Sequence, residues 1–221
     1  SGVLYGAADG STEVTTYGRQ STMECGLMLY AMAPEVVTAA NRQAAAVQDA
    51  MDAVFIRAGY DGLIMDRDMG GTNAPLVSPE VFGKCCQPFL RHRVAHAKAQ
   101  LKSLKPDGAF TPRVIMHNCG NTLSLLPHFI EGNIDGYQSL QTTAGMDIKK
   151  LRTMFGDRMA FWGGVPVEDL IGGSPDDVRT DVREVMALYR ESGRTGLILG
   201  PSQSIPCGTK YENFMTMLDT Y

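Results

Sequence analysis

One repeated pattern constrains the fold of this chain more than any other feature of its sequence. From residue 59 onward, a helix with polar and apolar faces ends in glycine, a short apolar strand follows, and polar or glycine residues open the next helix. Strands that alternate with helices form a parallel sheet through right-handed crossovers. The sequence therefore predicts an α/β protein. The expected strands are 62–65, 113–116, 134–137, 159–162 and 196–199, with 3–7 as a sixth candidate.

Capping residues mark where the helices begin and end. Two Ser-Pro pairs, at 78–79 and 174–175, place a capping serine before a proline at the first helical position. Glycines in the stretches RAGYDG, EGNIDG and ESGRTG are expected to end helices with a positive φ angle. Together with the helical spacing of apolar residues, these signals predict helices over 34–58, 79–104 and 175–192.

Length, charge and cysteine usage limit the class of protein. A chain of 221 residues suits one domain over 1–221, and a net charge of −4 gives no reason to expect a nucleic acid or an anionic membrane as partner. The longest apolar stretch, 27–33, is too short to span a bilayer. Five cysteines, two of them adjacent, argue against a disulfide framework and for a reducing cytoplasm.

Whether the predicted sheet is open or closed depends on its strand count. Five or six strands are fewer than the eight of a TIM barrel, which typically needs about 250 residues. No glycine-rich phosphate-binding fingerprint follows the first strand, which disfavours a nucleotide-binding open sheet. The pattern alone leaves both architectures open.

Chemically capable residues gather directly after the predicted strands. The carboxyl ends of parallel strands are where βα enzymes build their sites, so this placement predicts an enzyme. The residues concerned are Asp66 and Asp68, His117 and Cys119, Gln138 and Gln141, Gly163 and Gly164, and the segment 200–207.

The stretch VIMHNCGN places His117 and Cys119 two residues apart at a strand end, so both side chains should leave the backbone on the same side. Nitrogen and sulfur ligands suit zinc, but a zinc site needs three or four protein ligands. The alternative is a hydrogen-bonded core histidine beside a small buried cysteine. Asp66 and Asp68 have the same spacing, and either line the site or cap the turn before GGTN.

His92 and His96 are four residues apart on the predicted helix 79–104, among several basic residues. We interpret this pair as part of a solvated helix face and not as a pair of metal ligands.

Taken together, several motifs resemble the uroporphyrinogen decarboxylase superfamily, specifically its methyltransferase-like branch with an HxCG motif. The matching stretches are AGYDGLIMDRDMGG, SPEVF, HNCGNTLSLLPHFIEGNIDGYQSLQTTAGMDIKKLRTMFGDRMAFWGG and ILGPSQSIPCGTKYENF. The resemblance covers the chain from about residue 20 and implies a (β/α)8 barrel with its site at the C-terminal mouth. Because members usually exceed 300 residues, it also implies that the first one or two βα units are absent from this chain.

The resemblance further implies a zinc site. The family's zinc methyltransferases use the His and Cys of this motif, here His117 and Cys119, with a third cysteine from the loop after the last strand. Counted back from Glu212-Asn213, that ligand position falls at Gln203, and Cys207 lies four residues further on. Either Cys207 is the third ligand, which we expect, or the site has lost a strong ligand.

The function implied by the resemblance is a zinc-dependent methyl transfer between a corrinoid and a thiol-type acceptor. Alternatives are a metal-free tetrapyrrole decarboxylase of the uroporphyrinogen type and a partial barrel that binds a corrinoid without catalysis. Partners would be a small-molecule substrate, a corrinoid protein and a second copy of the chain. The expected roles are metal ligation by His117, Cys119 and Cys207, catalysis by Asp66, Asp68, Gln138 and Gln141, and cofactor binding by Gly163, Gly164 and Gln203.

Overall fold

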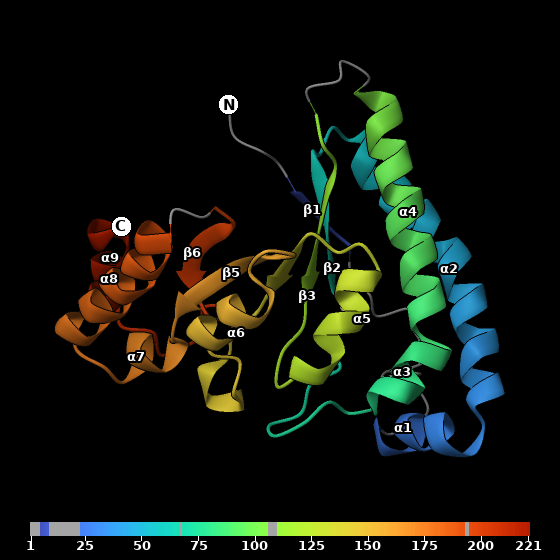
Figure 1. Ribbon diagram of the computed structural model, residues 1–221, viewed down its shortest axis with the longest axis horizontal. Helices are drawn as coiled ribbons and strands as arrows, with labels where there is room; N and C mark the ends of the chain where they lie inside the picture. The colour runs from blue at the N-terminus through green and yellow to red at the C-terminus, as the bar shows by residue number, and fades with distance from the viewer. Residues whose placement is uncertain (1–4, 9–22, 67, 106–109, 193–194) are drawn as a thin grey trace.

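A six-stranded parallel sheet forms the centre of the protein (Figure 1). The computed structural model describes residues 5–8, 23–66, 68–105, 110–192 and 195–221. All six predicted strands are present among these residues, with ends shifted by up to three positions. They are β1 (Tyr5–Ala8), β2 (Gly62–Asp66), β3 (Arg113–His117), β4 (Gly136–Gln138), β5 (Ala160–Val165) and β6 (Leu197–Pro201).

The strands lie side by side in chain order, from β1 to β6, and each neighbouring pair is parallel. In this order every crossover runs in the same sense and the helices cover one face of the sheet, as in a TIM barrel. A doubly wound sheet would instead reverse its order at a switch point. The fold is therefore α/β and of the barrel type, and the described residues form six of the eight strands of such a barrel.

The helices flank the sheet in two groups, α1 to α5 beside β1 to β3 and α6 to α9 beside β5 and β6 (Figure 1). The expected helix over 79–104 is broken at Cys86 into two helices, so the prediction of one continuous helix was wrong. Pro88 lies in the first turn of the second helix, where a continuous helix would lose a backbone donor and bring the proline ring against the carbonyl of Lys84. The helices are α1 (Met23–Met32), α2 (Pro34–Arg57), α3 (Pro79–Cys85), α4 (Gln87–Leu104), α5 (Leu126–Glu131), α6 (Ile148–Phe155), α7 (Val167–Ile171), α8 (Pro175–Ser192) and α9 (Tyr211–Thr220).

The predicted helix starts are confirmed by their capping bonds. Val81 N donates to Ser78 Oγ at 3.2 Å. Ser174 and Asp177 form a reciprocal capping box, with Ser174 N donating to Asp177 Oδ2 at 2.8 Å and Asp177 N donating to Ser174 Oγ at 3.3 Å.

The predicted helix ends are confirmed only in part. Gly59 has a φ of 98° directly after α2, as expected. After α5 the left-handed residue is Asn133 (φ 64°) and not Gly132 (φ −71°), so the EGNIDG prediction was off by one residue. Asparagine tolerates this conformation because its short polar side chain can bond locally. Gly193 of ESGRTG lies outside the described residues.

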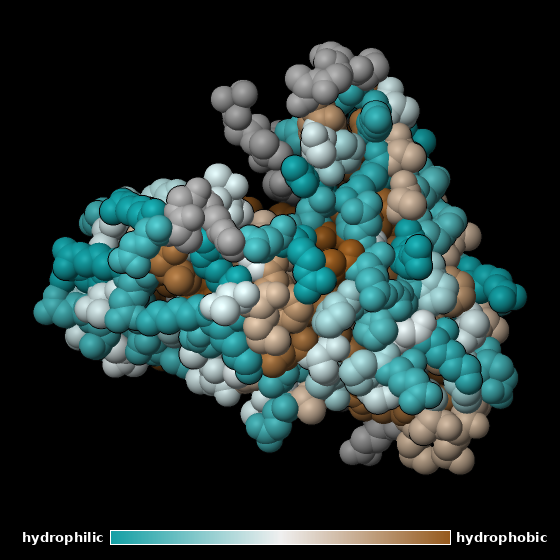
Figure 2. Space-filling view, in the orientation of Figure 1, coloured by the Kyte–Doolittle hydropathy of each residue, from teal (hydrophilic) through white to brown (hydrophobic). Residues whose placement is uncertain are grey.

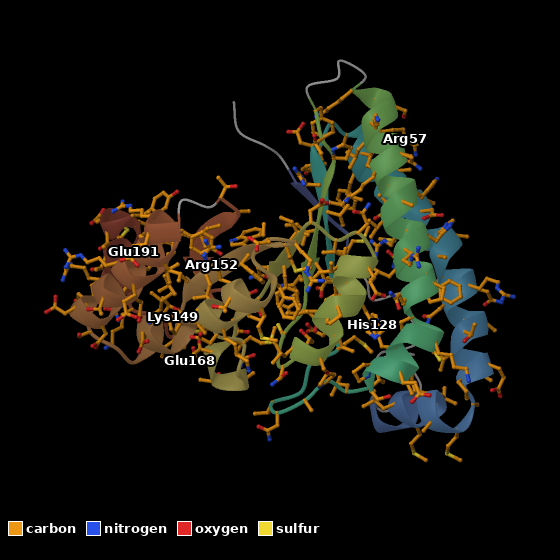
Figure 3. All side chains as sticks on the ribbon, viewed as in Figure 1. Arg57, His128, Lys149, Arg152, Glu168 and Glu191 are labelled. Atoms are coloured by element: carbon orange, nitrogen blue, oxygen red, sulfur yellow. The ribbon has the colours of Figure 1, made fainter. Side chains whose placement is uncertain are left out.

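Packing between α6 and α8 shows how the second group of helices is held. The Arg152 guanidinium is buried and lies 4.2 Å from the centre of the Tyr189 ring, whereas Lys149 faces solvent and pairs with Glu184 at 2.7 Å (Figure 3). One face of α6 therefore packs inward through a cation–π contact while the other remains solvated.

The surface in Figure 2 is mostly hydrophilic, with a pale brown area over α1 and the start of α2. The exposed apolar side chains there include Met28, Met32 and Val36. Within the described residues, no helix is both long and apolar enough to cross a membrane.

A group of acidic side chains at α7 and α8 makes stability depend on pH. Burial, and next the negative charge of Asp169, raise the pKa of Asp181 to about 7. The folded state therefore favours the protonated form of the Asp181 carboxyl. The stability that this preference contributes is fully present below about pH 4 and is lost as the pH rises to about 7 and above.

We expect Asp181→Asn to be more stable than the wild type at pH 8, by on the order of 1 kcal/mol after solvent screening. Urea unfolding of both proteins at pH 5 and pH 8 measures this difference. A difference that is the same at both pH values would contradict the assignment.

Candidate metal centre

The polar residues at the ends of three neighbouring strands lie in one row across the sheet. The register pairs Asp66 with His117 and His117 with Gln138. Residues in register on neighbouring strands project from the same face, so these three side chains lie on one side of the sheet at its carboxyl-terminal edge. This is the edge at which the sequence predicts a site.

Asp68, His117 and Cys119 converge at this edge, with one ligand atom from each residue within 4.8 Å of the other two. Cys119 Sγ is 3.4 Å from His117 Nε2, which confirms that the two side chains project to the same side. His117 Nε2 is 4.0 Å from an Asp68 carboxylate oxygen. Asn118 lies between His117 and Cys119 in the sequence and is fully buried. Its Oδ1 accepts a hydrogen bond from Met69 N at 2.9 Å.

The loops after β2 and β3 touch backbone to backbone, and this contact brings Asp68 into the site. A Cβ atom on Gly70 would lie 2.2 Å from the carbonyl oxygen of Cys119, and one on Gly120 would lie 2.6 Å from Gly70. Cys119 N donates to Asp68 Oδ1 at 2.8 Å across the same junction. Glycine at both positions is therefore required for Asp68 to reach the His-Cys pair.

Gln138 sets the orientation of the His117 ring. Its Oε1 is a hydrogen-bond acceptor, so His117 Nδ1 carries the proton and donates to it. Nε2 is then the nitrogen with the free lone pair, and it is the atom that faces Cys119 Sγ. A hydrogen bond to the far nitrogen is the usual way in which a metal-binding histidine is held.

The Cys119 thiol is protonated at neutral pH in the protein alone. Burial, and next the negative charge of Asp68, raise its pKa to about 11. A nucleophilic cysteine has the opposite tendency, because it needs a lowered pKa. Cys119 therefore fits a ligand that loses its proton to a cation and does not fit a free nucleophile.

The donor set and its spacing fit zinc. In tetrahedral zinc sites, bond lengths of about 2.0–2.3 Å place neighbouring ligand atoms about 3.3–3.6 Å apart. The observed separations are 3.4 Å for sulfur to nitrogen and 4.0 Å for nitrogen to oxygen, and the sulfur lies within 4.8 Å of the oxygen, so the three side chains must draw together to bind one ion. His117, Cys119 and Asp68 would hold the ion.

The loop after β6 brings Gln203, and not Cys207, to this group. Ser202 is fully buried and accepts from Leu140 N at 2.7 Å and from Val167 N at 3.1 Å, which fixes the start of the loop. Gln203 Oε1 then lies 3.9 Å from Cys119 Sγ.

Cys207 is exposed and is not one of the three residues that converge. Its part of the loop runs beside α7, where Lys210 N donates to the carbonyl of Leu170 at 3.0 Å. The third residue that the structure brings to the His-Cys pair is therefore Asp68, for which the sequence analysis expected a catalytic role and not metal ligation.

The remaining predicted residues have other visible contacts. Gln141 Oε1 accepts from Gly120 N at 3.2 Å, so this side chain supports the loop that carries Cys119. Gly163 and Gly164 have φ angles of 135° and 109°, and Cβ atoms there would press on Leu140 and Val185. Packing therefore accounts for both glycines, and their binding of a cofactor stays a prediction.

Sequence reasoning missed the parts of the site that depend on contacts between loops. Asn118, Gly70 and Gly120 hold the loops together, and the signal that could have found them is the pair of glycine-containing turns, DMGG and NCGN, after adjacent strands. Neighbouring strands place such turns side by side.

Comparison with known proteins agrees with this fold. The family model for uroporphyrinogen decarboxylase (URO-D) matches residues 4–221. A methyltransferase from Methanosarcina mazei is similar in structure, with a TM-score of 0.75 and 17% sequence identity over 99% of this chain. The chain spans 58% of the length of that methyltransferase. A search of curated proteins found no match.

Proposed function

Because the chain belongs to the uroporphyrinogen decarboxylase family, we propose that it acts as a zinc-dependent methyltransferase that moves a methyl group between a corrinoid and a thiol-type acceptor. The observation that supports this most is the convergence of Asp68, His117 and Cys119. A decarboxylase site has no need for a histidine and a cysteine aligned in this way.

The charges of the three ligands suit this chemistry. Cys119 as a thiolate and Asp68 as a carboxylate carry two negative charges, which balance a divalent cation, while His117 is neutral. Asp68 thus provides the second negative charge that a second cysteine would otherwise supply. Zinc bound here would lower the pKa of a substrate thiol, so that its sulfur is a thiolate at neutral pH.

Other residues of the chain would orient the reactants. Gln138 keeps His117 in the tautomer that leaves Nε2 free, and Gln203 lies at the sulfur of Cys119, where its amide can contact an incoming substrate. We assign the acceptance of the thiol proton to Asp66, and its register with His117 supports this role. In the transfer, one carbon–sulfur bond forms and one cobalt–carbon bond breaks.

An assay with methylcobalamin and 2-mercaptoethanol tests the proposal. We expect the zinc-loaded protein to form the methyl thioether and the protein stripped with a chelator to form none. Zinc analysis of the purified protein accompanies the assay, because stoichiometric zinc without methyl transfer would contradict the activity but not the metal centre.

A tetrapyrrole decarboxylase is the second candidate, favoured by the family's description and by two carboxylates, Asp66 and Asp68, after one strand. It predicts carbon dioxide release from uroporphyrinogen without any metal. A corrinoid-binding protein without catalysis is the third, and it predicts a spectral change with cobalamin but no product.

Zinc binding should release a proton from Cys119. Because its pKa is raised to about 11, the thiol must lose its proton to become a ligand, and the apparent zinc affinity should rise about tenfold per pH unit near neutrality. Calorimetry in two buffers with different ionisation enthalpies counts the protons released. We expect about one proton to be released for each zinc ion bound at this centre, and zinc binding without proton release would exclude Cys119 as a thiolate ligand.

A further inference from the structure

Two histidines of α4 share one carboxylate of α2 on the outer, helical layer of the protein. His92 Nε2 lies 2.8 Å from Asp49 Oδ2, and His96 Nδ1 lies 3.2 Å from Asp49 Oδ1. The two helices run side by side along one flank, remote in sequence but adjacent in space (Figure 1). The sequence shows only the pair of histidines, and the fold adds the carboxylate of Asp49 as a third side chain that can bind a metal.

The spacing of the histidines suits joint binding. Residues four apart on a helix have Cβ atoms about 5–6 Å from each other, so both imidazoles could reach one ion after their rings turn. In the present arrangement the ligand atoms of Asp49, His92 and His96 are not all within 4.8 Å of one another, unlike those of Asp68, His117 and Cys119. The two rings are nearly parallel, with an interplanar angle of 14° and centres 6.0 Å apart. The side chains of His92 and His96 are 56% and 39% exposed, which leaves room for their rings to rotate toward a common point.

The charge balance around Asp49 favours a cation. Its side chain is 18% exposed, and its ion-pair partners in the described part of the chain are these two histidines. The nearby Asp52 is already neutralised by Arg93, which donates to it twice at 2.8 and 2.9 Å. Among the described residues, Asp49 therefore forms no ion pair with a lysine or an arginine.

We propose that Asp49, His92 and His96 form a second metal site, which binds a divalent first-row transition metal such as Zn²⁺, Co²⁺ or Ni²⁺. Two imidazole nitrogens and one carboxylate oxygen are ligands that these ions accept, with water completing the coordination. Binding requires the exposed rings to turn from the two oxygens of Asp49 toward the ion. Because the ligands come from two helices, the ion would link α2 to α4. This site shares no residue with the proposed catalytic centre and does not depend on it.

Titration with Zn²⁺ in the Cys119→Ser background tests the site, because the first centre is then disabled. We expect this protein to bind one equivalent of Zn²⁺ at the second site. Saturating Zn²⁺ should raise its melting temperature by about 5 °C or more. Asp49→Asn and His96→Gln should each weaken binding about tenfold or more. His128→Gln is the matched control, since His128 lies on α5 and bonds to Gln87, and it should leave this equivalent unchanged.

The proposal is overturned if no Zn²⁺ binds to the Cys119→Ser protein. It is also overturned if Asp49→Asn and His96→Gln, made in that protein, leave its affinity for Zn²⁺ unchanged. Circular dichroism establishes that each variant is folded before titration. A third result, in which the variants lower the melting temperature but Zn²⁺ never raises it, would make the cluster an ion-pair link between the helices and would equally reject a metal site.

Discussion

His117→Ala and Cys119→Ser should each abolish methyl transfer and lower zinc affinity by about 100-fold or more. Each change removes one of the three proposed ligands, whose atoms lie within 4.8 Å of one another, and zinc sites in proteins use three or four protein ligands. Competition with a chromophoric chelator measures the affinity, and the methylcobalamin assay measures the activity.

Gln138→Leu separates the ligand role of His117 from its orientation. This variant keeps all three ligands but removes the acceptor that fixes the His117 ring, so we expect a smaller loss of zinc affinity, about 10-fold. If His117→Ala retained zinc as well as the wild type does, the histidine would be a hydrogen-bonded core residue, which is the alternative that the sequence left open.

Gly70→Ala should lower the free energy of unfolding by about 3 kcal/mol and also disrupt the metal centre. The added methyl group would lie 2.2 Å from the backbone oxygen of Cys119, and backbone atoms cannot move aside as a flexible side chain can. The loops after β2 and β3 must then separate, which breaks the bond from Cys119 N to Asp68 and moves Asp68 away from His117. Urea unfolding and zinc binding measure the two effects.

Gly172→Ala is the control for this change. A Cβ atom there would meet only the carbonyl oxygen of Glu168, at an ordinary 3.5 Å, and we expect a change below about 0.5 kcal/mol. Similar small effects at Gly70 and Gly172 would show that the two loops do not touch as described.

Local patterns in the sequence predicted the order of strands and helices and the positions of the strands. They also predicted that the side chains of His117 and Cys119 project to the same side of the sheet. These features depend on residues close together in the chain, such as the Ser-Pro caps and the two-residue period of β3. The break between α3 and α4 was equally local, since Pro88 marks it, and it was missed because the apolar spacing continues across it.

The position of Asp68 beside the His-Cys pair could not be predicted in the same way. Which side chain reaches the His-Cys pair depends on how closely the loops after β2 and β3 approach, and that distance is set by Gly70 against Gly120. Resemblance directed attention to the loop after β6 and to Cys207. The same limit applies to Asp49, which is 43 residues from His92 in sequence and meets it only because α2 packs on α4.

Zinc content after dialysis, compared between Asp68→Asn and Cys207→Ser, decides which residue is the third ligand beside His117 and Cys119. Both variants carry His96→Gln, as does their reference protein, so that only the centre at the strand ends is counted. We expect the reference protein and Cys207→Ser each to retain about one zinc per chain and Asp68→Asn to lose most of it. Loss of zinc from Cys207→Ser with full retention in Asp68→Asn would instead assign the third ligand to the loop after β6.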